Sequence, residues 1–481
     1  MDASEKLRRV FEDLDRDGNG RIWAWELLRK VGQAGIDPFE SRVRSALDGA
    51  RDADGQPLQT GPDQQPVQID YPEFIRIAQH GDGVIGRALN GELAVSPADW
   101  AQLCAGAKQI YEDLLANLDG ENAQYIATLR DANPNQFGVA ICSADGQLYK
   151  LGDCDVPFSV QSTSKPFTYA MALEELGSAE VDRWIGTEQS GGTFNDPMRS
   201  FDPNSKPHNG MINAGAIGAG ALVGSGKAQS ERFHLVKETW TAMMGKAPGF
   251  DNETFLAEDE TGDGNRQLAF AMAARGRLKG AGGLTSTAAA VEWYHRLCSQ
   301  EVDAARLAAA GATLANGGVA PYSGKRVFSH DTTRRVLSVM QHSGMYDGSG
   351  EFAHQVGLPA KSGVSGNVML ILPDQKCSVV VFSPPLNEVG NSVRGVEFAK
   401  RLVNDFNLHP YDRRTLERTR TTEADRPRNE ADIKAHTARQ IAAALSGMAS
   451  VGSNGPAALG GAPDAAAAMK AKGSQQTGPQ L

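Results

Sequence analysis

Cysteine is scarce in this chain. The 481 residues include five cysteines, an odd number, and none of them forms the Cys-x-x-Cys spacing of zinc sites and redox motifs. They are Cys104, Cys142, Cys154, Cys298 and Cys377. This scarcity argues against the disulfide framework that stabilises small secreted domains. We therefore expect reduced thiols, as in a cytosolic protein.

Long apolar runs and an excess of positive charge are also missing. No stretch approaches the ~18–20 apolar residues that span a bilayer, and residues 1–10 lack the apolar core of a signal peptide. The net charge is −10, and no basic stripe of the kind that binds nucleic acids is present. We therefore expect a cytoplasmic protein with neither a membrane nor a nucleic-acid partner.

The chain is too long for one hydrophobic core, because single cores stop growing near ~250–300 residues. Changes in composition divide it into a first unit at 1–80, a linker at 81–100, a main domain at 101–410 and a tail at 411–481. The tail is highly charged and then rich in Ala, Gly and Ser. We expect most of it to be disordered because it has few large apolar groups to bury.

The first unit contains a loop with the pattern of an EF-hand. Ca²⁺ takes about six to eight oxygen ligands, and its loop needs glycine at position 6 for a sharp turn and glutamate at position 12 to supply two oxygens. Residues 15–26 meet each demand, with Gly20 at position 6. We expect the ligands to be Asp15, Asp17, Asn19, the Arg21 carbonyl and Glu26. The alternative is an acidic, solvated turn that binds no metal.

A second, degenerate copy of this loop follows. Residues 52–55 begin like an EF-hand loop and residues 67–74 end like one, with Ile69 and Glu73 in the places of positions 8 and 12. The stretch at 56–66 between them is too long for the register. We expect this half to pair with the first and to bind metal weakly or not at all, which makes an all-α EF-hand pair.

Two short motifs about two hundred residues apart indicate serine acyl transfer. Ser162 and Lys165 open an apolar helical stretch and share a helix face, so a deprotonated lysine can take the serine proton. Taken alone, this spacing fits a solvated lysine on a surface turn better, because Ser-x-x-Lys occurs by chance in many helices. Lys361-Ser362-Gly363, however, leads into a hydrophobic strand. The order of the two motifs resembles that of the serine β-lactamases and penicillin-binding proteins, in which the second lysine adds positive charge to the site.

Further motifs make the chain similar to the serine-dependent glutaminases over about residues 100–408. The motifs are Gln161-Ser162-Thr163-Ser164-Lys165-Pro166, Lys206-Pro207-His208-Asn209, Met211-Ile212-Asn213-Ala214-Gly215-Ala216-Ile217, Gly344-Met345-Tyr346-Asp347 and Gly357-Leu358-Pro359-Ala360-Lys361-Ser362-Gly363-Val364. The resemblance implies hydrolysis of the side-chain amide of L-glutamine to glutamate and ammonia. It also implies no catalytic cofactor and assembly as a homo-oligomer, a dimer or a tetramer.

The same resemblance implies a fold of the serine β-lactamase type, in the α/β (α+β) class. We expect an antiparallel sheet with flanking helices and a helical lobe, with the site in the cleft between them. Hairpins are predicted at 137–143 with 147–151 and at 367–372 with 377–382, each around a short turn. A closing amphipathic helix is predicted at 393–406.

The chemical roles follow from the resemblance and from what each side chain can do. Ser162 is the nucleophile and forms an acyl-enzyme, with Lys165 as its base. Lys165 can act as a base only if burial and a neighbouring cation, Lys361, lower its pKa. Tyr294, in a stretch that matches the family's catalytic tyrosine helix, relays a proton to the departing ammonia. On sequence alone a tyrosine in an apolar helix is more often a core residue.

An oxyanion hole is expected from the backbone amides of Ser162 and Val364. We attribute Gly363 to a close approach of the chain to the substrate, with a strand bulge as the alternative. Gln161 and Ser164, which flank the nucleophile, are assigned structural roles.

Recognition of a free amino acid needs an anion for its ammonium group and donors for its carboxylate. Glu258 matches the substrate-binding glutamate of the family, and Asn213 and Asn265 supply amide contacts. Tyr346 is placed over the substrate, and Tyr125 completes the set. The alternative for the acidic stretch around Glu258 is a solvated turn.

Two other functions stay open from sequence alone. A penicillin-recognising hydrolase or peptidase of the same fold would need export and usually carries a Ser-x-Asn motif, and neither condition is met. An inert calcium-binding relative is the second alternative. It is disfavoured because each nominal catalytic position retains a competent residue.

Overall fold

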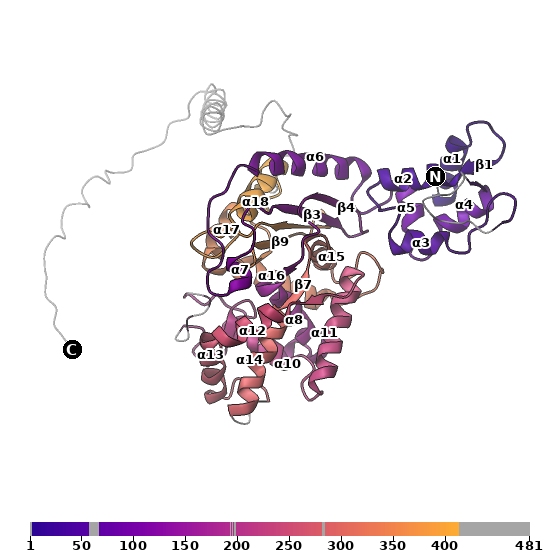
Figure 1. The fold of residues 1–481 in the computed structure, drawn as a ribbon. Coiled ribbons are helices and arrows are strands. Elements are labelled where there is room, and N and C mark those ends of the chain that lie inside the picture. Colours follow the sequence, from indigo (N-terminus) through magenta and orange to yellow (C-terminus); the bar gives the residue numbers. More distant parts are fainter. Residues whose placement is uncertain are drawn as a thin grey trace, which may run out of the picture. The chain divides into compact units, whose positions relative to one another are not determined.

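The computed structural model describes residues 2–56, 67–192, 194, 196, 199–280 and 284–412 (Figure 1). The middle of the second loop and the expected tail lie outside these described residues. All five cysteines are free and buried, which agrees with the expected thiols. No helix within the described ranges is long and apolar enough to cross a membrane.

The N-terminal unit consists of two helix–loop–helix halves joined by a short sheet. The first half contains α1 (Ala3–Leu14), β1 (Arg21–Trp23) and α2 (Ala24–Gln33). The second contains α3 (Ser41–Leu47), β2 (Gln68–Asp70) and α4 (Tyr71–Ala78). β1 and β2 pair antiparallel, with Ile22 opposite Ile69. The sequence predicted an all-α unit, whereas the structure contains this two-stranded sheet as well.

The core of this unit extends further along the chain than the sequence suggested. Phe11 and Phe74 from the two halves meet edge to face, with ring centroids 5.3 Å apart. α5 (Val84–Asn90) adds Val84 and Ile85 to the same buried cluster, which runs on to Leu93. The predicted linker at 81–100 is therefore largely part of the N-terminal core, and its last residues begin α6 (Pro97–Leu114).

The main domain is built on a five-stranded antiparallel sheet with the order β4-β3-β10-β9-β8. Its strands are β3 (Gly138–Ser143), β4 (Leu148–Gly152), β8 (Ala360–Gly363), β9 (Asn367–Leu372) and β10 (Cys377–Phe382). Both predicted hairpins are confirmed, and the second one matches residue for residue. β10 lies at the centre and is buried along its whole length, which explains its continuous apolar sequence.

Alternate residues of the strands pack against helices on opposite faces of the sheet. Val139 and Ile141 of β3 join the cluster that includes α6 and α18 (Val393–Phe406), the predicted closing helix. Ala140 and Cys142 join the cluster of α15 (Ala304–Ala315) on the other face. α17 (Ser349–Gln355) adds to the first of these clusters.

A helical lobe fills the sequence between β5 and β8. Its helices are α8 (Lys165–Leu176), α9 (Ser178–Val181), α10 (Asn213–Leu222), α11 (Gln229–Met244), α12 (Asn252–Thr261), α13 (Asp263–Ala274), α14 (Leu284–Cys298) and α16 (His330–Ser343). A small sheet has the order β5-β7-β6 and consists of β5 (Phe158–Ser159), β6 (Gly249–Phe250) and β7 (Gln300–Val302). Short helical turns complete the chain: α7 (Ala127–Arg130), η1 (Gln161–Ser164) and η2 (Tyr346–Gly348). The expected class, an antiparallel sheet with flanking helices plus a helical lobe, is confirmed.

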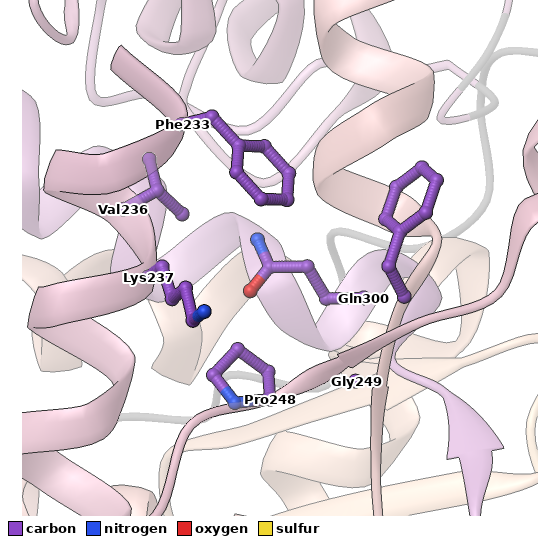
Figure 2. A pocket seen from close by; sticks show the side chains of 7 residues that line it. Phe233, Val236, Lys237, Pro248, Gly249 and Gln300 are labelled. Carbon is purple, nitrogen blue, oxygen red and sulfur yellow. The ribbon is translucent and has the colours of Figure 1, made fainter. Parts of the chain in front are cut away.

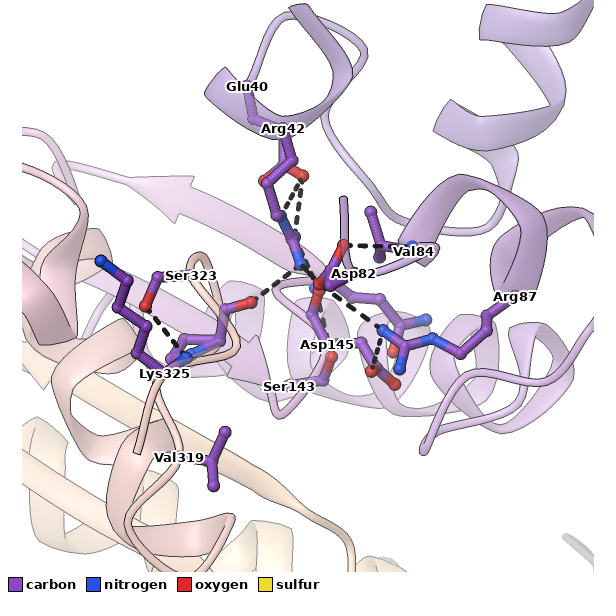
Figure 3. A network of polar contacts seen from close by, with 12 residues as sticks. Glu40, Arg42, Asp82, Val84, Arg87, Ser143, Asp145, Val319, Ser323 and Lys325 are labelled. Atoms are coloured by element: carbon purple, nitrogen blue, oxygen red, sulfur yellow. Dashed lines mark hydrogen bonds and ion pairs between the residues drawn. The ribbon is translucent and has the colours of Figure 1, made fainter. Parts of the chain in front are cut away.

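Arginines of the N-terminal unit bind the turn between β3 and β4 (Figure 3). Arg42 donates hydrogen bonds to the carbonyl oxygens of Pro321 and Asp145, each at 2.8 Å. Arg87 lies 3.0 Å from the Asp145 carboxylate. The two parts of the chain are thus joined by charge-assisted contacts.

Candidate active site

The candidate site is a cavity of about 420 Å³ between the start of α8, the helical lobe and the end of β8. Each residue predicted to bind the substrate lines it: Tyr125, Ser162, Asn213, Glu258, Asn265, Tyr294, Tyr346 and Val364. Gln161, Phe194 and Cys298, which the sequence analysis did not assign to the site, line it too. Segments separated by more than two hundred residues therefore contribute to one pocket.

Ser162 lies in the 3₁₀ turn η1, one residue after a strained backbone position. Gln161 has φ of 49°, a left-handed conformation that is uncommon outside glycine. The turn is anchored because the Val160 amide donates to the Gln300 carbonyl at 2.7 Å, and the Thr163 hydroxyl donates to the Val160 carbonyl at 2.6 Å. Such anchored strain is typical of functional sites.

Lys165 is the first residue of α8 and is 1% exposed. Its Nζ donates to Asn213 Oδ1 at 2.6 Å. Burial lowers the pKa of Lys165 to about 8, although Cys298 and Glu258 act in the opposite direction. About a tenth of this lysine is therefore a neutral amine at pH 7, and about half at pH 8, as a general base requires.

Lys361 on β8 is fully buried. The sequence predicted that it is a cation, and its surroundings do not favour the charged form. Its Nζ donates to the Ser362 carbonyl at 2.8 Å and lies 4.4 Å from the centre of the Tyr346 ring. Burial and, second, the charge of Lys165 hold the pKa of Lys361 well below its usual value. The expectation that Lys361 adds positive charge and lowers the Lys165 pKa is therefore not supported. Burial alone accounts for the lowered pKa of Lys165, because the charge of Lys361 is not among its causes.

Two tyrosines face the nucleophile end of the cavity. The Tyr294 hydroxyl lies 3.4 Å from Asn213 Oδ1, and the Tyr294 ring lies 5.9 Å from Lys165 Nζ. Tyr346 has φ of 51°, a second strained position. Burial raises the pKa of both phenols, so both are neutral and can donate a proton or a hydrogen bond.

Glu258 also lines the cavity and is 7% exposed. Its Oε1 accepts hydrogen bonds from the Tyr125 hydroxyl at 2.5 Å and from Gln161 Nε2 at 3.0 Å. Burial raises the pKa of Glu258, while these two donors and Lys165 lower it. Gln161 therefore contacts the site directly, and the purely structural role expected for it is wrong.

The backbone after β8 runs beside the start of η1. The Ser365 hydroxyl donates to the Ser159 carbonyl at 2.7 Å, which ties the Val364 segment to β5. Packing also requires a glycine at position 363, because a Cβ there would lie 2.7 Å from the buried Asn367 side chain. The close approach of this segment to the substrate stays a prediction.

A second cavity, of about 140 Å³, lies between α11 and the small sheet (Figure 2). Figure 2 shows the Gln300 amide pointing into it between Phe233 and Lys237. It shares no lining residue with the larger cavity and brings no second reactive group beside Lys237. We therefore assign no catalytic role to it.

No three His, Cys, Asp or Glu side chains gather in a metal-binding arrangement within the part of the chain that the structure describes. The loop at 15–26 is closed by hydrogen bonds from its own backbone amides to its acidic side chains. Asp15 accepts hydrogen bonds from the amides of Asn19 and Gly20, at 3.0 and 2.8 Å. Glu26 is buried, and its carboxylate is 3.9 Å from its ion-pair partner Arg16.

Comparisons with known proteins agree with this geometry. The model of the family named Glutaminase matches residues 120–411. "Putative glutaminase 3" of Caenorhabditis elegans is 36% identical over 86% of this chain and 69% of that protein. "Glutaminase liver isoform, mitochondrial" of Mus musculus is 39% identical over 65% of this chain, which corresponds to 51% of the mouse protein.

Solved structures give the same result. A crystal structure of "Mglu in its tris and glutamate form" is 41% identical, with a TM-score of 0.60 over 64% of this chain and 67% of that chain. "Probable glutaminase ybaS" is 33% identical, with a TM-score of 0.60 over 64% of this chain and 98% of that chain. These neighbours share the serine β-lactamase-like fold.

Proposed function

The chain belongs to the glutaminase family, and from this premise we propose that it hydrolyses L-glutamine to L-glutamate and ammonia through an acyl-enzyme on Ser162. One observation carries the proposal. A single cavity is lined by Ser162, three residues before a buried lysine of lowered pKa, and by the buried carboxylate of Glu258. A nucleophile and a carboxylate on one cavity wall suit a substrate that carries both an amide and an ammonium group.

Acylation begins at the side-chain amide of glutamine. Neutral Lys165 takes the Ser162 proton as Oγ bonds to the amide carbon, and the backbone amides of Ser162 and Val364 stabilise the negative oxygen that forms. The carbon–nitrogen bond then breaks. Tyr294 passes the proton from Lys165 to the leaving nitrogen, which departs as ammonia, and a γ-glutamyl ester on Ser162 remains.

Water completes the cycle. A water molecule attacks the ester carbon while Lys165 takes its proton, and the Ser162–carbon bond breaks as the serine regains a proton. Glutamate and the original enzyme are the products. In both half-reactions Asn213 holds the lysine amine through its side-chain oxygen.

Glu258 orients the substrate through its α-ammonium group. Tyr125 and Gln161 hold this carboxylate in place, and an arriving ammonium would lower its pKa by direct charge attraction. Asn213 and Asn265 lie on the cavity wall and supply amide contacts to the α-carboxylate. Tyr346 covers the substrate near the nucleophile.

The test is release of ammonia by the purified full chain from L-glutamine, from L-asparagine and, for the related fold, turnover of a chromogenic β-lactam. We expect activity on L-glutamine that disappears in Ser162→Ala and persists in Ser338→Ala, a matched change at an exposed serine of α16. Full activity in Ser162→Ala, or turnover of the β-lactam alone, would overturn the proposal.

We also propose that residues 1–80 form an EF-hand pair with one calcium site. The ligands are Asp15, Asp17, Asn19, the Arg21 carbonyl and Glu26. Support comes from the hydrogen-bonded loop, the buried Glu26 and the pairing of the two loops at Ile22 and Ile69.

The second loop lacks a free carboxylate at the equivalent of Glu26. Glu73 Oε1 already accepts hydrogen bonds from the Arg51 amide and from Arg76 Nε, each at 2.8 Å. Calcium would have to displace both of these contacts. We therefore propose weak binding or none at this loop.

Contacts at the C-terminal end of α2 support the proposal that calcium modulates activity. The carbonyls of Ala34 and Gly35, at its C-terminal end, accept hydrogen bonds from Gln147 Nε2 and the Leu148 amide at 2.7 and 3.1 Å. A calcium-dependent shift of α2 would therefore reach the edge of the catalytic sheet. Assembly into a dimer or tetramer and a cytoplasmic location remain predictions.

The modulation is tested by comparing kcat/KM with calcium and with EGTA. We expect calcium to change this ratio in the wild type and to have no effect in Glu26→Gln. Equal activity in both conditions would restrict calcium to a structural role and would refute modulation, whatever the binding affinity.

A further inference from the structure

A buried histidine lies directly behind the wall of the candidate site. His295 follows Tyr294 on α14 and is 0% exposed. Its Nδ1 lies 3.1 Å from Asp259 Oδ1, and its Nε2 lies 3.0 Å from Asn265 Nδ2. The imidazole thus links a carboxylate on α12 to a site residue on α13.

The hydrogen bonds continue from Asn265 to the catalytic lysine. Asn213 Nδ2 donates to Asn265 Oδ1 at 3.0 Å, and Lys165 Nζ donates to Asn213 Oδ1 at 2.6 Å. Each amide therefore has its oxygen committed to one neighbour and its nitrogen to the other. Inverting one amide would place two donors or two acceptors against each other.

This order of donors and acceptors determines the tautomer of His295. Asn265 presents its NH₂ group, so His295 Nε2 must accept and carry no proton. The proton of a neutral imidazole is then on Nδ1, where the Asp259 carboxylate accepts it.

The backbone makes room for this ring. Gly262 separates α12 from α13, and a Cβ at this position would lie 2.4 Å from His295 Cε1. Any side chain there would push the imidazole away from Asp259 and Asn265. The break between the two helices thus provides the space that the linked groups need.

We propose that His295, as the neutral Nδ1-protonated tautomer, is a positioning residue that orients Asn265 and Asn213 and so presents Asn213 Oδ1 to Lys165. The inference rests on the proposed glutaminase function and names a residue that acts behind the substrate pocket without touching the substrate.

The charges around His295 favour the neutral form. Burial lowers its pKa, while Asp259 raises it. Of the remaining groups that face it, Arg266 on α13 lowers the pKa and Glu292 on α14 raises it. Protonation at acid pH would place a second N–H against the Asn265 NH₂ group. Asn265 and then Asn213 would have to turn, and Lys165 would lose its acceptor.

Two substitutions of His295 test the roles of its two ring nitrogens separately. In His295→Gln, the amide oxygen can lie where Nε2 lies and preserves the acceptor for Asn265. In His295→Asn, the shorter side chain reaches only as far as Nδ1 and preserves the contact to Asp259. We expect His295→Asn to lower kcat/KM ~10-fold or more, and His295→Gln to restore most of this loss, because one buried partner is lost in the first variant and kept in the second.

The decisive measurement is the ratio of wild-type to His295→Gln kcat/KM as a function of pH. Lys165 and Glu258 titrate in both enzymes and cancel in the ratio. We expect a constant ratio near and above neutral pH, and a fall of about tenfold per unit below the His295 pKa, because only the wild type then loses its acceptor. His354→Gln, at an exposed position on α17, should give a ratio that does not change with pH. A ratio for His295→Gln that rises as pH falls would overturn the proposal, as would equal losses in the Asn and Gln variants at equal thermal stability.

A measurement without turnover distinguishes this inference from the proposed function. The measurement is ¹⁵N NMR of the imidazole groups in the Ser162→Ala variant. The His295 signals are identified because they disappear when His295→Gln is added. Their shifts should show a protonated Nδ1 and an unprotonated Nε2. If Nε2 carries the proton instead, the positioning role of His295 is overturned, even if the protein hydrolyses L-glutamine. If Nδ1 carries the proton but the wild-type protein does not hydrolyse L-glutamine, only the proposed function is refuted.

Discussion

Lys165 Nζ donates its hydrogen bond to Asn213 Oδ1 at 2.6 Å and makes no hydrogen bond to Ser162. An amide oxygen satisfies the buried amine without adding a negative charge. The pKa of Lys165 can therefore stay near 8, where burial places it. A carboxylate in the same position would stabilise the ammonium form and remove the base.

This relationship gives a direct prediction for Asn213→Asp. A carboxylate in contact with Nζ should raise the pKa of Lys165 by ~1–3 units, because an opposite charge at short range favours the charged form. The acid limb of kcat/KM should move to higher pH by the same amount. Asn213→Ala is the matched control and should lose activity without this displacement. If the acid limb of the kcat/KM profile lies at the same pH in the wild type and in Asn213→Asp, the assignment of Lys165 as the base is contradicted.

The wild-type pH profile should follow the neutral fraction of Lys165. Its folded pKa is lowered from 10.5 to about 8, so the reactive amine increases as pH rises and is nearly complete above that value. We expect kcat/KM to rise about tenfold per unit below pH 8 and then to level off. Lys165→Ala should cost ~10³-fold or more, and its combination with Ser162→Ala should cost little extra, because the two residues act as one unit. Near-wild-type turnover of Lys165→Ala at neutral pH would rule out the lysine base.

Selectivity for L-glutamine over L-asparagine should be strong. Glu258 holds the ammonium end at a set distance from Ser162, and asparagine is one methylene shorter. Its carbonyl would fall more than ~1 Å short of the nucleophile, and a misplacement of this size can cost ~10²-fold. Competition assays with both amides measure kcat/KM directly. Comparable values would show that Glu258 does not set the distance.

Calcium binding should depend on Glu26 and not on Glu73. Glu26→Gln removes a charge and one of two ligand oxygens, so titration calorimetry should show that the tight site is lost. Glu73→Gln is the matched control, since this carboxylate is already bound to Arg51 and Arg76, and it should leave the tight site intact. Two equally tight sites in the wild type, or none, would contradict the assignment of one site.

The elements that the sequence predicted well are those with local signals. The strands at 367–372 and 377–382 and the helix at 393–406 were predicted at their observed bounds. A short turn separates the two strands, and the apolar positions of the helix recur with helical spacing. The α/β class and the resemblance to glutaminases followed from such segments in order. The residues predicted to bind the substrate were also found in one cavity.

What the sequence could not decide depends on groups that are distant in the chain. The pKa of Lys361 is lowered by its complete burial and by the charge of Lys165, and no motif records that burial. Gln161 reaches Glu258, and His295 reaches Asn265, only after the helical lobe folds against the start of α8. The sequence by itself determined which reactive groups are present and the secondary structure that carries most of them. Tertiary structure alone decided their protonation and their partners, because desolvation and hydrogen-bond direction depend on the three-dimensional surroundings of each group.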